Sequence, residues 1–113
     1  PDTTPPTVTA TSPASGVIGV SRTANITATF SEAMAAATIN TGTVELRDAS
    51  GTLVPAVMTY STANRRATLN PTPTLNALAI YTVTVKGGAA DPRVKDVAGN
   101  ALATSAIWSF TTR

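Results

Sequence analysis

The sequence predicts an all-β fold, a two-sheet Greek-key sandwich of seven or eight short strands. Three observations support this prediction. Several short segments alternate apolar and polar side chains, which is the pattern of a strand with one buried face. Gly, Pro, Asn and Ser interrupt these segments about every 8 to 12 residues. No long helical period lies between them, so only one short helical turn is expected, near residues 32–38.

Three strands are predicted in the N-terminal half, at residues 7–12, 25–30 and 42–48. Between the first two, a turn at residues 12–16 leads into an apolar stretch at residues 17–20 that is expected to rejoin the edge of the core. Alternation within the second and third strands defines their buried face. The predicted inward residues are Ile26, Ala28, Phe30, Val44 and Leu46.

The helical turn is predicted where the alternation stops after Phe30. Ser31 is the expected N-cap, because a hydroxyl there accepts a backbone N–H of the first turn. Glu32 favours that first turn through its charge, and the alanines that follow favour helix. These features predict a turn or two of helix between the second and third strands.

A hairpin is predicted in the middle of the chain. Residues 53–60 form its first strand, and Pro55 predicts an edge strand or a bulge because proline cannot donate to a ladder. The tip lies at residues 64–66, and the returning strand turns Ala67 and Leu69 inward. A proline-rich segment at residues 70–74 ends this strand.

The last third of the chain carries the clearest alternation, at residues 80–85 and 107–112. It also contains the only Trp, one of two Phe and one of two Tyr, and hence most of the aromatic area available to a core. These side chains are expected to pack between the two sheets. The predicted core residues are Phe30, Leu46, Leu69, Tyr81, Val83, Trp108 and Phe110.

Composition excludes several classes of function. Charged residues make up only 12% of the chain and the net charge is +2. The basic residues are scattered and do not alternate with aromatic ones, so nucleic acid is not an expected partner. There is no cysteine, which excludes disulfides and thiolate chemistry. No apolar run approaches about 18 residues, so no membrane span is expected.

Five motifs occur in order along the chain: residues 11–16 (Thr-Ser-Pro-Ala-Ser-Gly), 30–34 (Phe-Ser-Glu-Ala-Met), 75–85, 96–100 (Asp-Val-Ala-Gly-Asn) and 108–112 (Trp-Ser-Phe-Thr-Thr). Together they resemble the bacterial Ig-like (Big) domains. The resemblance implies an Ig-like sandwich that acts as a non-catalytic structural or spacer module. Its parent would be a larger bacterial secreted or cell-surface protein, such as an adhesin or a multidomain polysaccharide-active enzyme.

The resemblance also implies a domain organisation and a location. Residues 1–6 look like an interdomain linker, and residues 7–113 form the Ig-like domain. The expected location is extracellular or at the cell surface. The expected partners are neighbouring domains of the same chain, and the isolated domain is expected to be a monomer.

The segment at residues 30–34 also resembles the copper-resistance C proteins, a more distant family. Their copper sites use histidines, and this chain has none. Met34 and Met58 are the only soft ligands and are far apart in sequence. A copper site is therefore not predicted.

Asp96 and Asn100 bracket Gly99 in the loop before the last strand. The favoured interpretation is a turn in which Asp96 caps backbone N–H groups while Gly99 and Asn100 take positive φ. The alternatives are a calcium site in this loop and a calcium site between domains. Calcium takes about six to eight oxygens, and the acidic spacing of a dedicated calcium loop is absent, so no cofactor is predicted. The candidate calcium ligands are Asp2, Glu32, Asp91, Asp96 and Asn100.

Catalysis is not expected. Glu32 has no partner acid, because Glu45 alternates with inward residues and should face outward. No histidine is present for a Ser-His-Asp arrangement. Tyr81 is expected to hydrogen-bond a backbone group near Leu75 or Asn76, as the tyrosine corner of a sandwich does. The residues assigned structural roles are Phe30, Glu32, Tyr81, Gly99, Trp108 and Phe110.

The alternative function is a binding module for a glycan, or for a host or cell-surface protein, through an exposed sheet face or loops. Carbohydrate-binding sandwiches offer aromatic rings to sugars, and only Tyr60 is expected to be available. A Lys–Asn isopeptide crosslink would need Lys86 or Lys95 beside an asparagine and a buried acid, and it is not expected.

Overall fold

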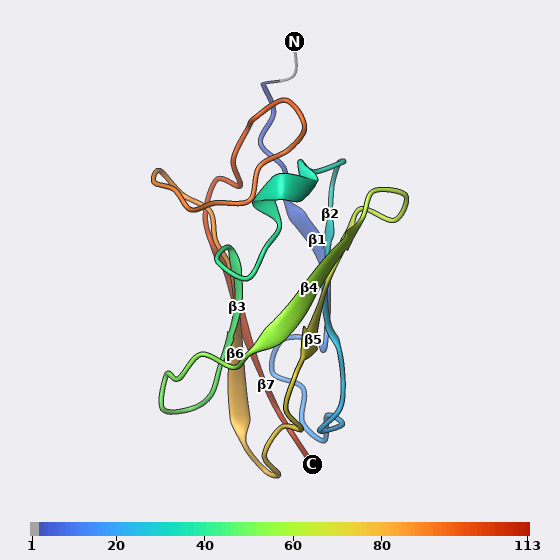
Figure 1. Cartoon of the computed structure of the whole chain (residues 1–113), viewed down its shortest axis with the longest axis vertical. Helices are drawn as coiled ribbons and strands as arrows, with labels where there is room; N and C mark the ends of the chain where they lie inside the picture. The colour runs from blue at the N-terminus through green and yellow to red at the C-terminus, as the bar shows by residue number, and fades with distance from the viewer. Residues whose placement is uncertain (1–2) are drawn as a thin grey trace.

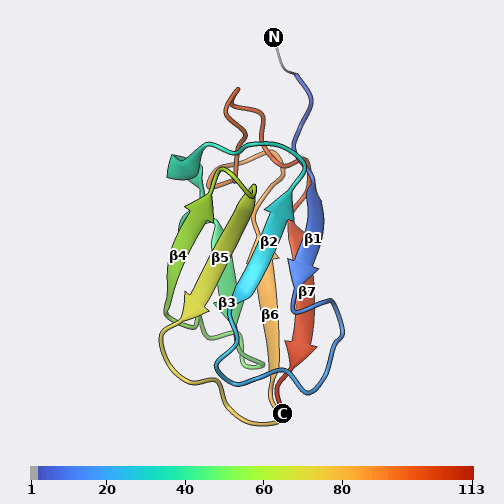
Figure 2. The ribbon, with the colours of Figure 1, turned by 90° about the vertical axis from the view of Figure 1, so that its right-hand side faces the viewer.

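The computed structural model describes residues 3–113, and these form seven strands in two antiparallel sheets (Figures 1 and 2). One sheet has the order β1-β2-β5-β4 and the other β3-β6-β7. This is the strand order of a constant-type immunoglobulin sandwich, so the predicted Greek-key fold is confirmed. The strands are β1 (Val8–Ser12), β2 (Ile26–Phe30), β3 (Val44–Arg47), β4 (Ala56–Ser61), β5 (Arg66–Pro71), β6 (Ile80–Val85) and β7 (Ala106–Thr111).

The two sheets pack face to face over alternate residues of their strands. In the β6–β7 pair, Tyr81 lies opposite Phe110 and Val83 opposite Trp108, and all four are buried. The Tyr81 and Phe110 rings are stacked with their centroids 5.9 Å apart. The whole predicted core is buried: Phe30, Leu46, Leu69, Tyr81, Val83, Trp108 and Phe110.

One short helical turn lies within residues 32–38, as predicted, but its cap and first turn are not where the sequence placed them. The structure has one 3-10 turn, η1 (Ala36–Thr38), whose N-cap position is Ala35 and which has no side-chain cap. Ser31 instead accepts the Thr7 N–H through its Oγ at 2.9 Å. The predicted cap at Ser31 and first turn at Glu32 are therefore wrong. Met34 forms a β-bridge with Asp96, and Ala35 donates its N–H to the Lys95 carbonyl at 2.9 Å, so the chain is still extended at Ala35. Within residues 3–113, no helix is long and apolar enough to cross a membrane.

Residues 16–20 run parallel to the end of β7 and cover its outer edge. Thr111 donates its N–H to the Val17 carbonyl at 2.9 Å, and Val20 donates to the Thr111 carbonyl at 3.1 Å. Arg113 then donates to the Val20 carbonyl at 3.0 Å. The segment thus joins the three-stranded sheet through its backbone, a pairing that the sequence did not predict.

The predicted hairpin and edge strand are confirmed. β4 is an outer strand of the four-stranded sheet, and Pro55 lies immediately before it. The hairpin tip contains Arg65 at φ 56°, and the following strand buries Ala67 and Leu69 as expected.

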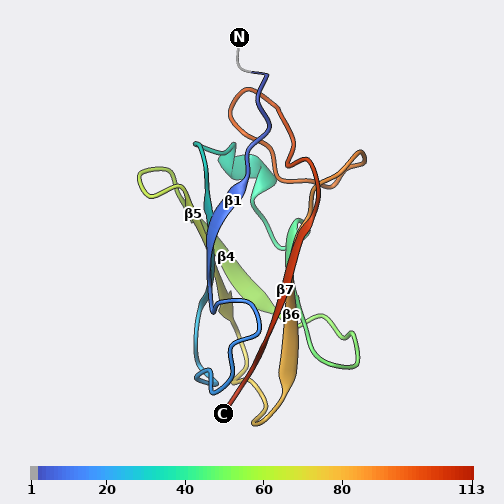
Figure 3. The same cartoon turned by 180° about the vertical axis from the view of Figure 1, so that it is seen from behind.

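The sandwich is elongated, with principal extents of 47 × 27 × 22 Å. The N-terminal segment lies at one end of the long axis and the C-terminus at the other (Figures 1 and 3). We call these ends the N-terminal pole, with loops 31–43, 62–65 and 86–105, and the C-terminal pole, with loops 13–25, 48–55 and 72–79. Ile18 is 76% exposed at the C-terminal pole, so the expectation that it joins the core is wrong. Its segment is held by backbone bonds instead.

Candidate functional site

The loop that carries Asp96 and Asn100 is a closed turn. The Asp96 side chain is fully buried, and it accepts the Asn100 backbone N–H at 2.8 Å and the Asn100 Nδ2 at 3.0 Å. The backbones of the two residues also pair, with the Asp96 N–H 2.8 Å from the Asn100 carbonyl. Gly99 has φ 93°, but Asn100 is not at positive φ, because one left-handed residue is enough to close the turn. The carboxylate thus serves the turn itself.

Asp91, at the same pole, is an ion-paired surface carboxylate. Arg93 Nε lies 3.0 Å and Lys95 Nζ 3.2 Å from its Oδ1. Hydrogen bonds from Arg93 and then Lys95 hold the pKa of Asp91 below its ordinary value. Two cations therefore already surround the oxygens that a calcium ion would need.

The candidate calcium ligands form no group of three or more acidic side chains in the part of the chain that the structure describes. Residues 3–113 contain no group of three or more acidic, histidine or cysteine side chains that could hold a metal ion. Asp2 lies outside the described residues. Calcium takes about six to eight oxygens, more than the carboxylates of Asp91 and Asp96 supply.

The two glutamates occupy different surroundings. Glu45 lies on the outer face of β3, away from Val44 and Leu46, as predicted. Its carboxylate pairs with Arg47 at 3.4 Å and with Lys86 at 3.5 Å. Glu32 is half-buried in the loop before η1. The structure thus places Glu45 in a surface ion-pair cluster.

Tyr81 makes the hydrogen bond expected of it. Its hydroxyl accepts the Asn76 backbone N–H at 2.8 Å. Thr112, which is buried, completes the connection: its Oγ1 donates to the Asn76 carbonyl and accepts the Ala79 N–H at 3.0 Å. Sequence reasoning did not single out Thr112. The signal was its alternation with Trp108 and Phe110, which places a polar side chain on the buried face.

Tyr60 and the two methionines belong to the packing of the sandwich. Tyr60 is half-buried, and its hydroxyl accepts the Met34 N–H at 2.7 Å, so its ring is not an open platform for a sugar. Met34 is buried, and Met58 packs against the core from β4. Both thioethers thus contribute to the packing of the sandwich.

Trp108 is an interior residue, only 6% exposed. Within residues 3–113 its Nε1 is the one buried side-chain polar atom that lacks a hydrogen-bond partner. An indole N–H left in this state costs free energy, and burial of the large apolar ring offsets that cost.

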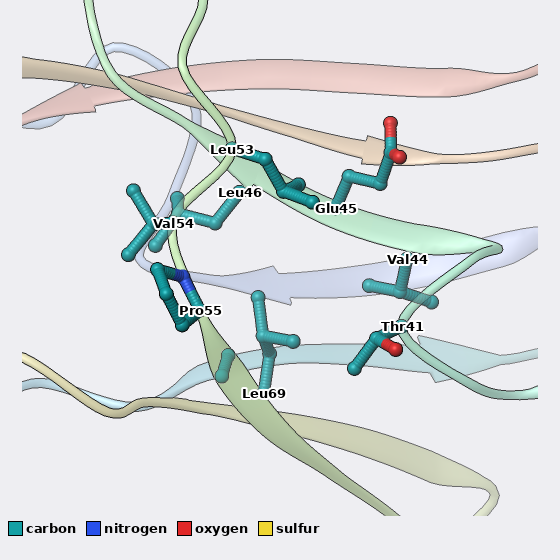
Figure 4. A pocket seen from close by; sticks show the side chains of 9 residues that line it. Thr41, Val44, Glu45, Leu46, Leu53, Val54, Pro55 and Leu69 are labelled. Atoms are coloured by element: carbon teal, nitrogen blue, oxygen red, sulfur yellow. The ribbon is translucent and has the colours of Figure 1, made fainter.

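One apolar pocket opens between β3 and β4, at the side of the sandwich (Figure 4). Its volume is about 260 Å³, below the roughly 300 Å³ at which ligand sites begin. Glu45 is the only charged residue in its lining and is already ion-paired. The pocket thus offers apolar contact and no reactive group. Its apolar lining includes Val44, Leu46, Leu53, Val54, Pro55 and Leu69.

Comparison with known proteins agrees with this fold. Residues 2–112 match the family described as bacterial Ig-like domain. A search of curated proteins found no match. Among solved structures, CopC from Methylosinus trichosporium OB3b superposes with a TM-score of 0.74 at 18% identity, over 95% of this chain and 92% of that chain.

Two further solved structures are similar. PcoC, a methionine-rich copper resistance protein from Escherichia coli, has a TM-score of 0.75 at 15% identity, over 97% of this chain and all of that one. Surface layer protein SbsC, domains 1–6, has a TM-score of 0.67 at 21% identity; the match covers 96% of this chain but 14% of that one. These identities establish the fold alone. The family match extends over almost the whole length, and the chain is therefore a member of the bacterial Ig-like domain family.

Proposed function

We propose that this domain is a non-catalytic spacer in a larger bacterial secreted or cell-surface protein, such as an adhesin or a multidomain polysaccharide-active enzyme. The observation that carries the proposal is that the first described residues and the C-terminus lie at opposite ends of the long axis of the sandwich (Figures 1 and 3). A domain with this geometry holds its neighbours apart along a line. The similarity to domains within a multidomain surface-layer protein supports the same role.

Tension between the two ends would load a defined set of backbone bonds. Residues 16–20 and β7 run parallel, joined by the bonds of Val17, Val20 and Arg113. Pulling draws the N-terminal segment toward one pole and β7 toward the other, so these bonds are loaded along the strands. Hydrogen bonds that are loaded along the strands must break at the same time, which suits a spacer under force.

The neighbouring domains are the proposed partners, with residues 1–6 as the linker to the preceding one. Pro6 is buried and the Thr7 N–H is bonded to Ser31, so the linker meets an anchored start of the domain. At the other pole, Leu78 is 82% exposed and donates its N–H to the Arg113 carbonyl at 3.3 Å. Apolar side chains around the C-terminus favour contact with a following domain.

Single-molecule force spectroscopy tests the spacer. The domain is held between two reference domains and pulled from residues 1 and 113. We expect one unfolding event, at a force lowered by Thr111→Pro, which removes the bond to the Val17 carbonyl. Extension without a resolved unfolding force would contradict the proposal. A glycan array tests the carbohydrate-binding alternative, and reproducible binding would favour it instead.

A further inference from the structure

The two sheets have four outer strands, and three of them are covered or interrupted. Residues 16–20 bond along β7, and Val54 donates to the Leu46 carbonyl at 2.8 Å beside β3. A bulge near Val8 interrupts β1. Proteins protect sheet edges in these ways because an open edge accepts another strand. The fourth outer strand, β4, is protected only by Pro55, which lies just before its first residue (Figure 2).

The ladder with β5 determines which backbone groups of β4 are unpaired. Ala56 lies opposite Pro71, and Thr72 donates to the Pro55 carbonyl at 2.8 Å, which sets the phase of the hydrogen bonds. The residues that turn their N–H and C=O toward β5 are Val57, Thr59 and Ser61. The residues that turn theirs outward are Ala56, Met58 and Tyr60. Within the described chain, no backbone hydrogen bond reaches these outward groups, which we call the β4 edge.

The composition of β4 favours pairing of the β4 edge with an uncharged strand. No charged residue occurs from position 49 to 64, so two copies of β4 can lie side by side without opposing like charges on the strands themselves. The side chains of Met58 and Tyr60 face inward and are half-buried. Val57, on the outer face, is 58% exposed. Burial of these groups by a partner strand would remove apolar surface from water.

The edge is also self-complementary. Its three residues are spaced evenly about Met58, so an antiparallel second copy places Met58 opposite Met58 and Ala56 opposite Tyr60. Each outward N–H then meets a C=O of the partner, as a two-fold interface requires. Val57 of each copy lies beside Thr59 of the other. The partner strand also lies next to the apolar pocket, whose lining includes Ala56 (Figure 4).

We propose that the β4 edge is a self-association surface, through which two copies of this domain pair into one continuous sheet. This goes beyond the spacer function and departs from the expected monomer. The edge lies on the long side of the sandwich, away from both chain ends (Figures 1 and 2). Two chains can therefore associate side by side while each continues end to end.

Sedimentation equilibrium of the domain is the first test. We expect the mass to rise with concentration from 11.4 kDa toward twice that value. Val57→Lys with Thr59→Lys places like charges opposite each other across the dyad and should weaken association at least about tenfold. Val57→Glu with Thr59→Lys places opposite charges there and should restore it. Ile80→Lys with Ile107→Lys, at exposed sites on the other sheet, is the charge-matched control and should leave it unchanged.

Amide hydrogen exchange followed by NMR is the second test. With rising concentration, the amides of Ala56, Met58 and Tyr60 should become protected. Those of Val57 and Thr59 bond to β5 and should be protected at every concentration, which also verifies that each variant is folded.

Three results would overturn the proposal. They are a mass of 11.4 kDa through millimolar concentration, a lysine double variant that associates as tightly as its control, and concentration-dependent protection at another strand. None of them affects the force experiment, because that experiment pulls single copies.

Discussion

The two long sides of the sandwich differ in how they close the space between the sheets. On the β1–β7 side, residues 16–20 add backbone bonds along β7, and Trp108 and Phe110 fill the interior behind them. On the β3–β4 side, the side chains of residues 53–55 border a pocket of about 260 Å³, and the outer backbone of β4 is unpaired. We call these the closed side and the open side. We expect the closed side to contribute more to the stability of the fold, and the proposed self-association to use the open side.

The largest expected difference between the sides comes from truncating large side chains. Phe110 is 1% exposed on the closed side, so Phe110→Ala should lower the free energy of unfolding by about 3–5 kcal/mol. Leu53 is 45% exposed on the open side, so Leu53→Ala should cost less than about 1 kcal/mol. Urea unfolding measures both. Equal losses would mean that the two sides do not differ in stability.

Proline substitutions compare the backbones of the two edges. Thr111→Pro removes the N–H that bonds to Val17 and leaves a carbonyl without its partner, at a cost of about 2 kcal/mol. Ala56→Pro removes an N–H that points away from β5, so its cost in the monomer should be under half of that. Thermal and urea unfolding at low protein concentration check both values. A larger loss for Ala56→Pro would show that the β4 edge is already engaged within the domain.

For the two tyrosine hydroxyls we expect the opposite result, in which the larger loss of stability comes from the open side. Tyr60, on the open side, accepts an N–H from Met34, which is 1% exposed, so Tyr60→Phe leaves a buried donor and should cost about 1.5 kcal/mol. Tyr81 accepts an N–H from Asn76, an exposed residue that water can reach, so Tyr81→Phe should cost about 0.5–1 kcal/mol. Chemical unfolding measures both. If Tyr81→Phe costs more than Tyr60→Phe, the more stabilising of the two hydroxyl hydrogen bonds lies on the closed side.

The smallest expected effect is a pH dependence on the open side. Hydrogen bonds from the Ser50 side chain and then the Thr52 backbone hold the pKa of Asp48 below its ordinary value. The folded state therefore binds the proton less tightly, and this contribution to stability is present above about pH 4 and is lost as the pH falls through the folded pKa. Asp48→Asn should lower the melting temperature slightly at neutral pH. The two melting curves should converge below about pH 3, and a constant difference would contradict the assignment.

Much of the architecture could be predicted because the information is local. Alternation within β2, β3, β6 and β7 identified each buried face, and Pro55 identified β4 as an outer strand. The Tyr81 hydrogen bond followed from the same pattern. The helical turn lies within the predicted range, but its cap was predicted at Ser31, because local propensity does not register the pairing of Met34 with the distant Asp96.

The sequence by itself determined the fold class, the core residues of the alternating strands and the absence of histidine and cysteine chemistry, because composition and period-two alternation are properties of the chain alone. Only the tertiary structure decided which edges are covered and which acids are paired. Those outcomes depend on segments far apart in sequence, such as residues 16–20 beside β7 and Lys86 beside Glu45. Local patterns specify which face of a strand is buried, but the backbone hydrogen bonds at its edge depend on what the rest of the chain brings there.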